Sequence, residues 1–297
     1  MSDNLILDPI RIEYIWGHED WCISAHPRAD CRIRGVAYGG WTLSRLWQEH
    51  RELFGNLAGN VFPLLIKRIE TDADVSIQVH PDDAYAKAHE NGALGKSECW
   101  YILNLKPGTK TAILGHHAKD SAEAEQMVRG GRWQEFLNEV PVQEGSFLQI
   151  DPGTVHAVHG GTRFIETQQN SDVTYRLYDY GRLQNGKPRQ LHVEQALACI
   201  RSPYAPRPAQ QKTEEGAGWK RTQLVECAYY GTEKVDLDGS MPADYRHAFE
   251  TVSVLSGEGK IGGTPVKEGT FLILPSGCGT QTWSGRFSAL VSWPISR

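Results

Sequence analysis

The sequence predicts a mainly β protein that contains two related units of the jelly-roll or sandwich type, together with a few helices. Many short runs of β-forming residues are separated by Gly and Pro turns, which is typical of these architectures. One segment also recurs, because residues 144–156 (EGSFLQIDPGTVH) match residues 268–280 (EGTFLILPSGCGT) without gaps. Each copy reads as a Glu-Gly turn, a short apolar strand and a Pro/Gly turn, so the recurrence indicates a duplicated β unit.

The elements follow from local patterns along the chain. Residues 1–40 carry turn and loop signals around short apolar runs. The first helix has a possible cap at Thr42 or Ser44 and a terminating Gly55. In chain order we expect helices over residues 42–55, 82–92, 118–140 (broken at Gly130-Gly131) and 191–200, and strands over residues 62–70, 76–80 and 99–105, followed by short strands from GSFLQI to VTYRLYDY.

The best linker candidate is the segment 202–218, SPYAPRPAQQKTEEGAG, which is rich in Pro, Gly and polar residues. The residues after it show strand and turn signals with little helical pattern. We therefore expect two domains, one over residues 1–204 that carries the helical segments and a second β unit over residues 205–297.

Composition narrows the possible functions. The 297 residues carry a net charge of −5 without a block of like charge, which argues against nucleic acid as the main partner, although a small anion remains possible. The N-terminus lacks the pattern of a signal peptide, and no apolar stretch reaches the length of a membrane span. The six cysteines form no Cys-x-x-Cys pair, so we expect reduced thiols and a cytoplasmic protein.

Residues 76–83, SIQVHPDD, raise the possibility of a metal site. Alternation places Gln78 and His80 on one face of a strand, opposite Ile77 and Val79. Pro81 then ends the strand. The same pattern also fits an ordinary strand with a polar outer face.

Two other strands offer further ligands. Glu98 directly precedes the apolar run CWYIL, where a charge is costly to bury unless it is paired or bound to a metal. His156 ends the first copy of the repeat, whereas the second copy has Thr280 there, so the turn itself does not require histidine. These residues make a plausible site for zinc or a similar divalent ion.

Each of these residues also has an ordinary interpretation. His80 can be a strand-end residue, Glu98 can be solvated beside Lys96, and His156 can lie in a surface turn. The chain has eleven histidines, and His116-His117 and His159 are other possible ligands.

Longer segments resemble the type I phosphomannose isomerases in their short bacterial form. The matching segments run in order from about residue 10 to residue 200 and include PLLIKRIETDADVSIQVHPDDAYA, GKSECWYIL, PGTVHAV and ETQQNSDVTYRLYDYGR. The resemblance implies a cupin fold of two jelly-roll units with helical insertions. It also implies one metal ion, usually zinc, in the first unit and a metal-free second unit.

The resemblance further implies an enzyme that interconverts mannose 6-phosphate and fructose 6-phosphate through a cis-enediol(ate), with the metal as Lewis acid. Its partner would be a small sugar phosphate, with neither nucleic acid nor a membrane involved, and nothing indicates an oligomeric state. The implied metal ligands are Gln78, His80, Glu98 and His156. The implied catalytic residues are Arg176, which would stabilise charge, Lys96 and Asp172, and the candidates for binding the phosphate are Ser76, Lys67, Lys96 and Arg176.

Some points stay open at the level of sequence. The proton-transfer base could be Lys96, Asp172 or a metal-bound water, and Asp172 could equally be a turn-forming residue. The turn Asp151-Pro152-Gly153 and the segment Gly39-Gly40-Trp41 depart from the usual family pattern. Alternative functions are an isomerase for a related sugar or sugar phosphate, an iron oxygenase, or a sugar-binding cupin without catalysis.

Overall fold

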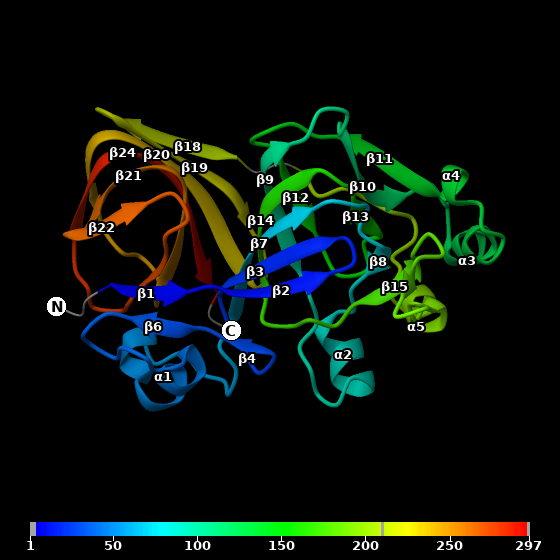
Figure 1. Cartoon of the computed structure of the whole chain (residues 1–297), viewed down its shortest axis with the longest axis horizontal. Coiled ribbons are helices and arrows are strands. Elements are labelled where there is room, and N and C mark those ends of the chain that lie inside the picture. The colour runs from blue at the N-terminus through cyan, green and yellow to red at the C-terminus, as the bar shows by residue number, and fades with distance from the viewer. Residues whose placement is uncertain (1–3, 209–210, 296–297) are drawn as a thin grey trace. The chain divides into compact units, whose positions relative to one another are not determined.

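The computed structural model describes residues 4–208 and 211–295 and confirms a mainly β protein. The chain forms two compact units, each made of separate stretches (Figure 1). Unit 1 comprises Met1–Arg11, Asp20–Lys67 and Ala209–Arg297, and unit 2 comprises Ile12–Glu19 and Arg68–Pro208. This division differs from the expected one, because most of the first 67 residues group with the C-terminal strands and not with residues 68–204.

Unit 1 is built around a nine-stranded sheet with the order β18-β19-β20-β24-β21-β23-β1-β6, in which β22 also pairs with β21. Leu5 of β1 pairs with Ile273 of β23, which explains why the N-terminus belongs to this unit. The strands are β1 (Leu5–Asp8), β6 (Arg32–Arg34), β18 (Lys212–Gly216), β19 (Trp219–Glu226), β20 (Tyr230–Ala243), β21 (Glu250–Ile261), β22 (Thr264–Lys267), β23 (Phe271–Leu274) and β24 (Gln281–Pro294).

The helix expected over residues 42–55 is confirmed, with one interruption. The Oγ1 of Thr42 accepts a hydrogen bond from the backbone N–H of Arg45 and caps α1 (Leu43–Glu49). His50 leaves the helical conformation, a single turn η1 (Arg51–Phe54) follows, and Gly55 ends it at φ 64°. Leu43, Leu46 and Trp47 are the buried residues of α1.

The first 40 residues carry turn and loop signals around short apolar runs, and the structure shows far more strand there than those signals indicated. They form β1, β6, β2 (Ile10–Tyr14), β3 (Gly17–Ile23) and the short pair β4 (Ala25–His26) and β5 (Ala29–Asp30). The segment IRIEY does alternate apolar and charged residues, which is a strand pattern. With β7 (Leu64–Thr71), β2 and β3 belong to a six-stranded sheet of order β12-β9-β14-β7-β3-β2.

Unit 2 places two sheets around one apolar core. The five-stranded sheet has the order β11-β10-β13-β8-β15, and β12, β9 and β14 come from the six-stranded sheet. Trp100, Ile102 and Phe164 of the latter pack with Leu114 and Val158 of the former. The strands are β8 (Ile77–Val79), β9 (Glu98–Leu105), β10 (Thr111–His116), β11 (Leu137–Pro141), β12 (Phe147–Ile150), β13 (His156–Val158), β14 (Thr162–Gln169), β15 (Tyr175–Tyr178), β16 (Leu183–Gln184) and β17 (Lys187–Pro188).

Helices cover the other face of the five-stranded sheet. Ile77 and Val79 of β8 pack in one cluster with Met127 of α3, Phe136 of α4 and Ala196 of α5. Unit 2 has the helices α2 (Asp83–His89), α3 (Ser121–Arg129), α4 (Trp133–Phe136) and α5 (Val193–Cys199). The opposite residues of β8 therefore face the interior between the two sheets.

The segment 118–140 is helical only in part. The break at Gly130-Gly131 is confirmed, since α3 ends at Arg129 and α4 begins at Trp133. The expectation of helix up to residue 140 is wrong, because β11 begins at Leu137 and pairs with β10. Pairing at the edge of the sheet thus determines the conformation that the local pattern had suggested to be helical.

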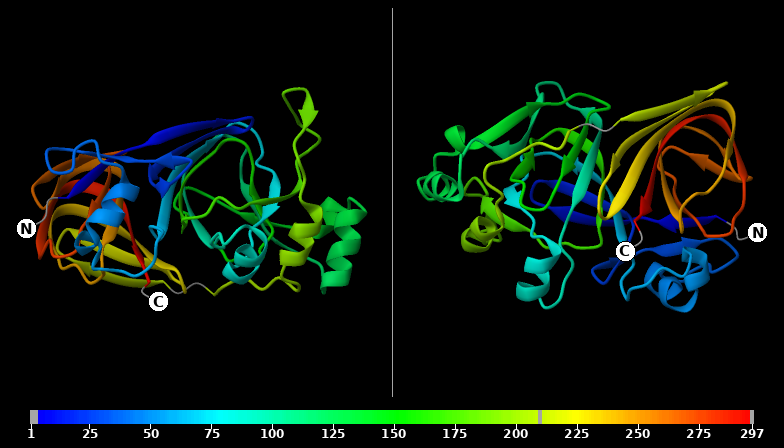
Figure 2. Two further views of the ribbon diagram at one scale, coloured as in Figure 1. Left: turned by 90° about the horizontal axis from the view of Figure 1, so that it is seen from below. Right: turned by 180° about the vertical axis from the view of Figure 1, so that it is seen from behind.

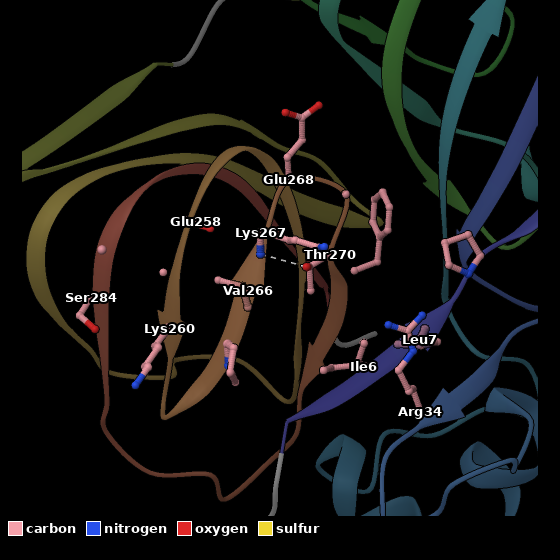
Figure 3. A pocket seen from close by; sticks show the side chains of 16 residues that line it. Ile6, Leu7, Arg34, Glu258, Lys260, Val266, Lys267, Glu268, Thr270 and Ser284 are labelled. Atoms are coloured by element: carbon pink, nitrogen blue, oxygen red, sulfur yellow. Dashed lines mark hydrogen bonds between the residues drawn. The ribbon is translucent and has the colours of Figure 1, made fainter.

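The sequence repeat is a structural repeat. Gly145 and Gly269 have φ angles of 83° and 79°, and Gly153 and Gly277 have φ angles of 86° and 74°. Each copy also has the same hydrogen bond in its first turn. The hydroxyl of the residue that follows Gly145 or Gly269 accepts a hydrogen bond from the backbone N–H three residues before it. In the second copy this bond joins Lys267 N to Thr270 Oγ1 at 3.1 Å (Figure 3), and in the first it joins Gln143 N to Ser146 Oγ at 2.9 Å.

The repeat extends to the neighbouring strand. In the first copy Ile150 pairs with Glu98 of β9, and in the second Leu274 pairs with Glu250 of β21. Glu250 therefore occupies in unit 1 the register position that Glu98 occupies in unit 2. Both carboxylates are buried.

A hollow of about 880 Å³ lies in unit 1 beside the second copy of the repeat (Figure 3). Its lining includes Lys260 and Ser284, with Ile6 and Arg34 on the other side. None of the residues predicted to form the functional site lines this hollow.

Among the helices of the described residues, none combines the length and the apolar character that a membrane crossing requires.

An aromatic cluster in unit 1 gives a first prediction. The ring centroids of Phe54 and Phe62 lie 5.3 and 5.2 Å from that of Phe249, and all three side chains are buried. Phe249→Ala should lower the free energy of unfolding by about 3–5 kcal/mol, because it leaves a cavity among rings that cannot fully close it. Urea unfolding checks this, and a loss below about 1 kcal/mol would contradict a tightly packed cluster.

Glu250 gives a second prediction. Burial raises the pKa of Glu250 to about 7, with Glu233 acting in the same direction and Arg221 opposing it. At pH values between the pKa of an exposed glutamate and about 7, Glu250 is protonated in the folded protein but ionised in the unfolded chain. The protonated carboxyl therefore contributes stability at low pH, and this contribution is lost as the pH rises through about 7.

Glu250→Gln should therefore flatten the pH dependence of stability between about pH 5 and pH 8, by up to about 3 kcal/mol. Urea unfolding at both pH values, for the variant and the wild type, measures the difference. Parallel pH profiles for the two proteins would show that Glu250 does not titrate in this range.

Candidate metal centre

Strand β8 presents Gln78 and His80 to the interior of unit 2, as alternation predicted. Ile77 and Val79 are buried against the helices, and Gln78 lies between them on the opposite face. His80 follows directly after the strand and is 1% exposed. Its backbone carbonyl accepts a hydrogen bond from Gly153, in the turn that leads to His156.

Strand β13 begins at His156 and lies beside β8. His156 is the cross-strand partner of Gln78, and Gln78 is in turn the partner of Arg176 on β15. Residues that pair directly across antiparallel strands project from the same face of the sheet. The three side chains therefore form a row across the interior face of the five-stranded sheet.

Glu98 comes from the other sheet, at the start of β9, and its side chain is fully buried. Its Oε1 lies 3.2 Å from Nε2 of His156 and 3.5 Å from Nε2 of His80. Ligand atoms of His80, Glu98 and His156 all lie within 4.8 Å of one another, so these three residues could hold a metal ion. The amide nitrogen of Gln78 lies 3.2 Å from His156 Nε2.

Backbone carbonyls orient both imidazoles. The Nδ1 of His80 donates to the carbonyl of Val173 at 2.8 Å, and the Nδ1 of His156 donates to the carbonyl of Thr154 at 2.8 Å. The proton on Nδ1 leaves a lone pair on each Nε2, which points at the cluster. Metal-binding histidines are commonly fixed in this way by a partner at the other ring nitrogen.

The charges of the cluster suit a cation. Burial lowers the pKa of His80 to about 3, assisted by the positive charge of Lys96, so this imidazole is neutral and able to bind a metal. Burial alone would raise the pKa of Glu98, but the positive charge of Lys96 opposes it, and this pKa lies well below its usual range. Glu98 is thus a carboxylate anion.

The donor atoms fit a divalent metal. His80 Nε2 and Glu98 Oε1 are buried and have no hydrogen-bond partner within the described residues, which is costly without a ligand. Two imidazoles, a carboxylate and an amide are ligands that zinc and related ions accept. Rotating the side-chain amide of Gln78 by 180° would point its oxygen, instead of its nitrogen, at the cluster. The two ends of an amide have nearly the same shape, so either orientation fits.

Lys96 lies against the cluster, and a residue beside it was missed by the sequence analysis. The Nζ of Lys96 is 2.8 Å from Glu98 Oε2 and 3.5 Å from Oε1 of Glu166, a buried residue of β14. Glu166 also accepts a hydrogen bond from Nε1 of Trp100 at 2.9 Å. The strand RFIETQQ mixes polar and apolar residues, so Glu166 violates no local pattern, and its nearness to Lys96 depends on the pairing of β14 with β9.

The other predicted residues occupy different positions. Asp172 lies in the loop before β15, next to Val173, whose carbonyl holds His80. Ser76 is buried directly before β8. Lys67 belongs to unit 1, where its ammonium nitrogen lies 5.0 Å from the centroid of the Trp21 ring. The roles predicted for these residues stay predictions.

The alternative histidines lie apart from the cluster. Nε2 of His116 is 3.0 Å from the carbonyl of Arg201, and the ring stacks on Phe136. His159 lies 3.4 Å from a carboxylate oxygen of Asp74. Each of these rings has a partner of its own.

Comparison with known proteins adds a separate line of evidence. The family model of the phosphomannose isomerase type I catalytic domain matches residues 13–125. Mannose-6-phosphate isomerase ManA of Bacillus subtilis (strain 168) is 39% identical over 98% of this chain and 99% of its own length. Mannose-6-phosphate isomerase of Streptococcus mutans serotype c is 38% identical over 92% of this chain and 87% of its own length.

A solved structure agrees with both relatives. The crystal structure of the mannose 6-phosphate isomerase from Bacillus subtilis matches with a TM-score of 0.95 at 37% identity, over 98% of this chain and 99% of that one. Similarity at this level extends over nearly the full length of the chain and therefore covers both units. The chain therefore belongs to the type I phosphomannose isomerase family.

Proposed function

We propose that the protein is a metal-dependent aldose–ketose isomerase that interconverts mannose 6-phosphate and fructose 6-phosphate. The observation that carries this proposal is the buried cluster of His80, Glu98 and His156 in a chain with full-length relatives named mannose-6-phosphate isomerases. The reaction transfers a hydrogen between C1 and C2 through a cis-enediol(ate), which requires a base and stabilisation of negative charge on oxygen.

We propose that the chain folds as two cupin-type jelly-roll units. The repeated turns with their matching glycine conformations support a common origin for β12 with β9 and for β23 with β21. In this proposal unit 2 holds the metal, and the counterpart in unit 1 is metal-free because Thr280 stands where unit 2 has His156.

The proposed metal is zinc, held by Gln78, His80, Glu98 and His156. When bound, it would act as a Lewis acid that polarises the sugar oxygens. The chain itself provides the two imidazoles, the buried carboxylate and the exclusion of water around them. It also provides the ammonium group of Lys96, 2.8 Å from Glu98, as a hydrogen-bond donor beside the reacting centre.

We assign charge stabilisation to Arg176. Its pairing with Gln78 places it on the face that carries the candidate ligands. Its Nε donates to the carbonyl of Gln190 at 3.1 Å, which fixes the guanidinium plane. A fixed, permanently charged fork is well suited to an oxyanion or a phosphate.

Among the residues of the chain, the candidates for proton transfer at C2 are Asp172 and Lys96, of which Lys96 would have to act as a neutral amine. Lys96 is buried between two carboxylates, and Asp172 precedes the residue that orients His80. Ser76, two residues before Gln78 on the same strand face, and Lys67 are the proposed further contacts of the phosphate. Comparing kcat for Lys96→Gln and Asp172→Asn separates the two candidate bases.

Removal of the metal or of one ligand should abolish turnover. His156→Ala should lower the zinc content measured by mass spectrometry, and it should lower kcat/KM on mannose 6-phosphate by at least about 100-fold, as should a chelator on the wild type. His159→Ala is the matched control, because this histidine pairs with Asp74 outside the cluster. Full zinc content and full turnover in His156→Ala would overturn the metal assignment.

Arg176→Ala should lower kcat on mannose 6-phosphate by roughly 100-fold, because a preorganised cation that meets developing charge acts mainly in the transition state. Steady-state kinetics measure this effect directly. A change confined to KM would instead make Arg176 a contact of the bound substrate only.

A further inference from the structure

A short hairpin of unit 2 brings a second arginine to Arg176. The hairpin consists of β16 and β17 and turns at Asn185-Gly186, which have φ angles of 54° and 76°. In the left view of Figure 2 it projects, in yellow-green, from the rest of unit 2. Its returning arm continues through Arg189 to Gln190, whose carbonyl accepts from Arg176.

The base of the hairpin is fixed by one buried carboxylate. Asp179 is 3% exposed and follows directly after β15. Its Oδ1 accepts from Arg182, just before β16, and from Nη1 of Arg189 at 3.0 Å, just after β17. Asp179 therefore holds both arms of the hairpin and sets the position of Arg189.

The two arginines at this base differ in how their donors are used. Arg182 donates to the carbonyls of Asp179 and Asp74 as well as to the Asp179 carboxylate. Within the part of the chain that the structure describes, Arg189 donates a hydrogen bond only through Nη1, to Asp179, whereas a guanidinium has five N–H donors. Its side chain is 11% exposed, so its remaining donors are held in a largely enclosed position.

The local charge is positive. Arg182 and Arg189 both pair with one buried carboxylate, Asp179, while Arg176 bonds to the backbone carbonyl of Gln190. The nearby Asp74 carboxylate already binds the backbone of Gly160 and lies beside His159. Burial and the charge of Arg189 both lower the pKa of Arg176, which places the two guanidiniums within each other's field. Such a pair is stabilised by an anion that both can contact.

We propose that Arg189, positioned by Asp179, forms an anion subsite with Arg176 that binds the phosphate group of the sugar phosphate. The identity of the sugar in this proposal rests on the proposed function. The anion subsite itself would accept the phosphate group of any phosphate monoester. A phosphate dianion offers several acceptor oxygens to the planar forks of two arginines. The hairpin β16–β17 thereby becomes an element of substrate specificity.

The test uses the full-length, metal-loaded protein and inorganic phosphate as the probe. Arg189→Gln should raise the Kd for phosphate, measured by calorimetry, about tenfold, and should raise KM for mannose 6-phosphate by a similar factor with kcat changed less than about twofold. Arg189→Lys keeps the charge and should recover part of the loss. Arg132→Gln is the matched control, because Arg132 forms an exposed ion pair with Glu135 one helical turn away.

A second measurement needs no variant. Saturating phosphate should slow the modification of Arg189 by phenylglyoxal several-fold in the wild type, as followed by mass spectrometry, and should leave Arg132 unaffected. Equal modification of Arg189 with and without phosphate, or an unchanged Kd in a folded Arg189→Gln protein, would overturn the subsite. A wild type that binds phosphate through Arg189 but does not turn over mannose 6-phosphate would refute the isomerase and leave the subsite standing.

Discussion

The structure of the site depends on a carboxylate that has no access to water. Glu98 is fully buried, and a charge in that position must be matched by nearby cations or by a metal. Lys96 supplies one partner from the loop just before β9, whereas the imidazoles come from β13 and from the residue after β8, in the opposite sheet. The spacing of the two sheets of unit 2, and the carbonyls that orient the rings, therefore have to be maintained for this one charge to be tolerated.

The sequence was informative where a residue violated its local pattern. Glu98 was identified because it stands next to an apolar run, and His156 because the second copy of the repeat has Thr280 at the same position. Alternation along the strand placed Gln78 and His80 on one face. Strand pairing could not be predicted from the sequence, because the register that joins His156, Gln78 and Arg176 links residues far apart in the chain. Glu166 and Arg189 were missed for this reason, and β11 was taken for helix because its pairing with β10 outweighs its local propensity.

The two copies of the repeat show how surroundings determine the chemistry of one residue type. Glu98 and Glu250 share a strand register and a high degree of burial. The charge of Lys96 lowers the pKa of Glu98 against the effect of burial, whereas burial and Glu233 raise that of Glu250. One position thus holds a buried anion in unit 2 and a carboxyl group that keeps its proton to about pH 7 in unit 1.

The pairing of β1 with β23 also sets an order of assembly during synthesis. β1 is the first strand to leave the ribosome, yet its partner emerges only after more than two hundred further residues have been translated. Leu5 and Leu7 are buried in the finished sheet, so their side chains lack this packing until β23 has been synthesised. Most of unit 2 lies in one continuous stretch that is complete earlier, so the unit that contains His80 and His156 can fold first, and the nine-stranded sheet closes last.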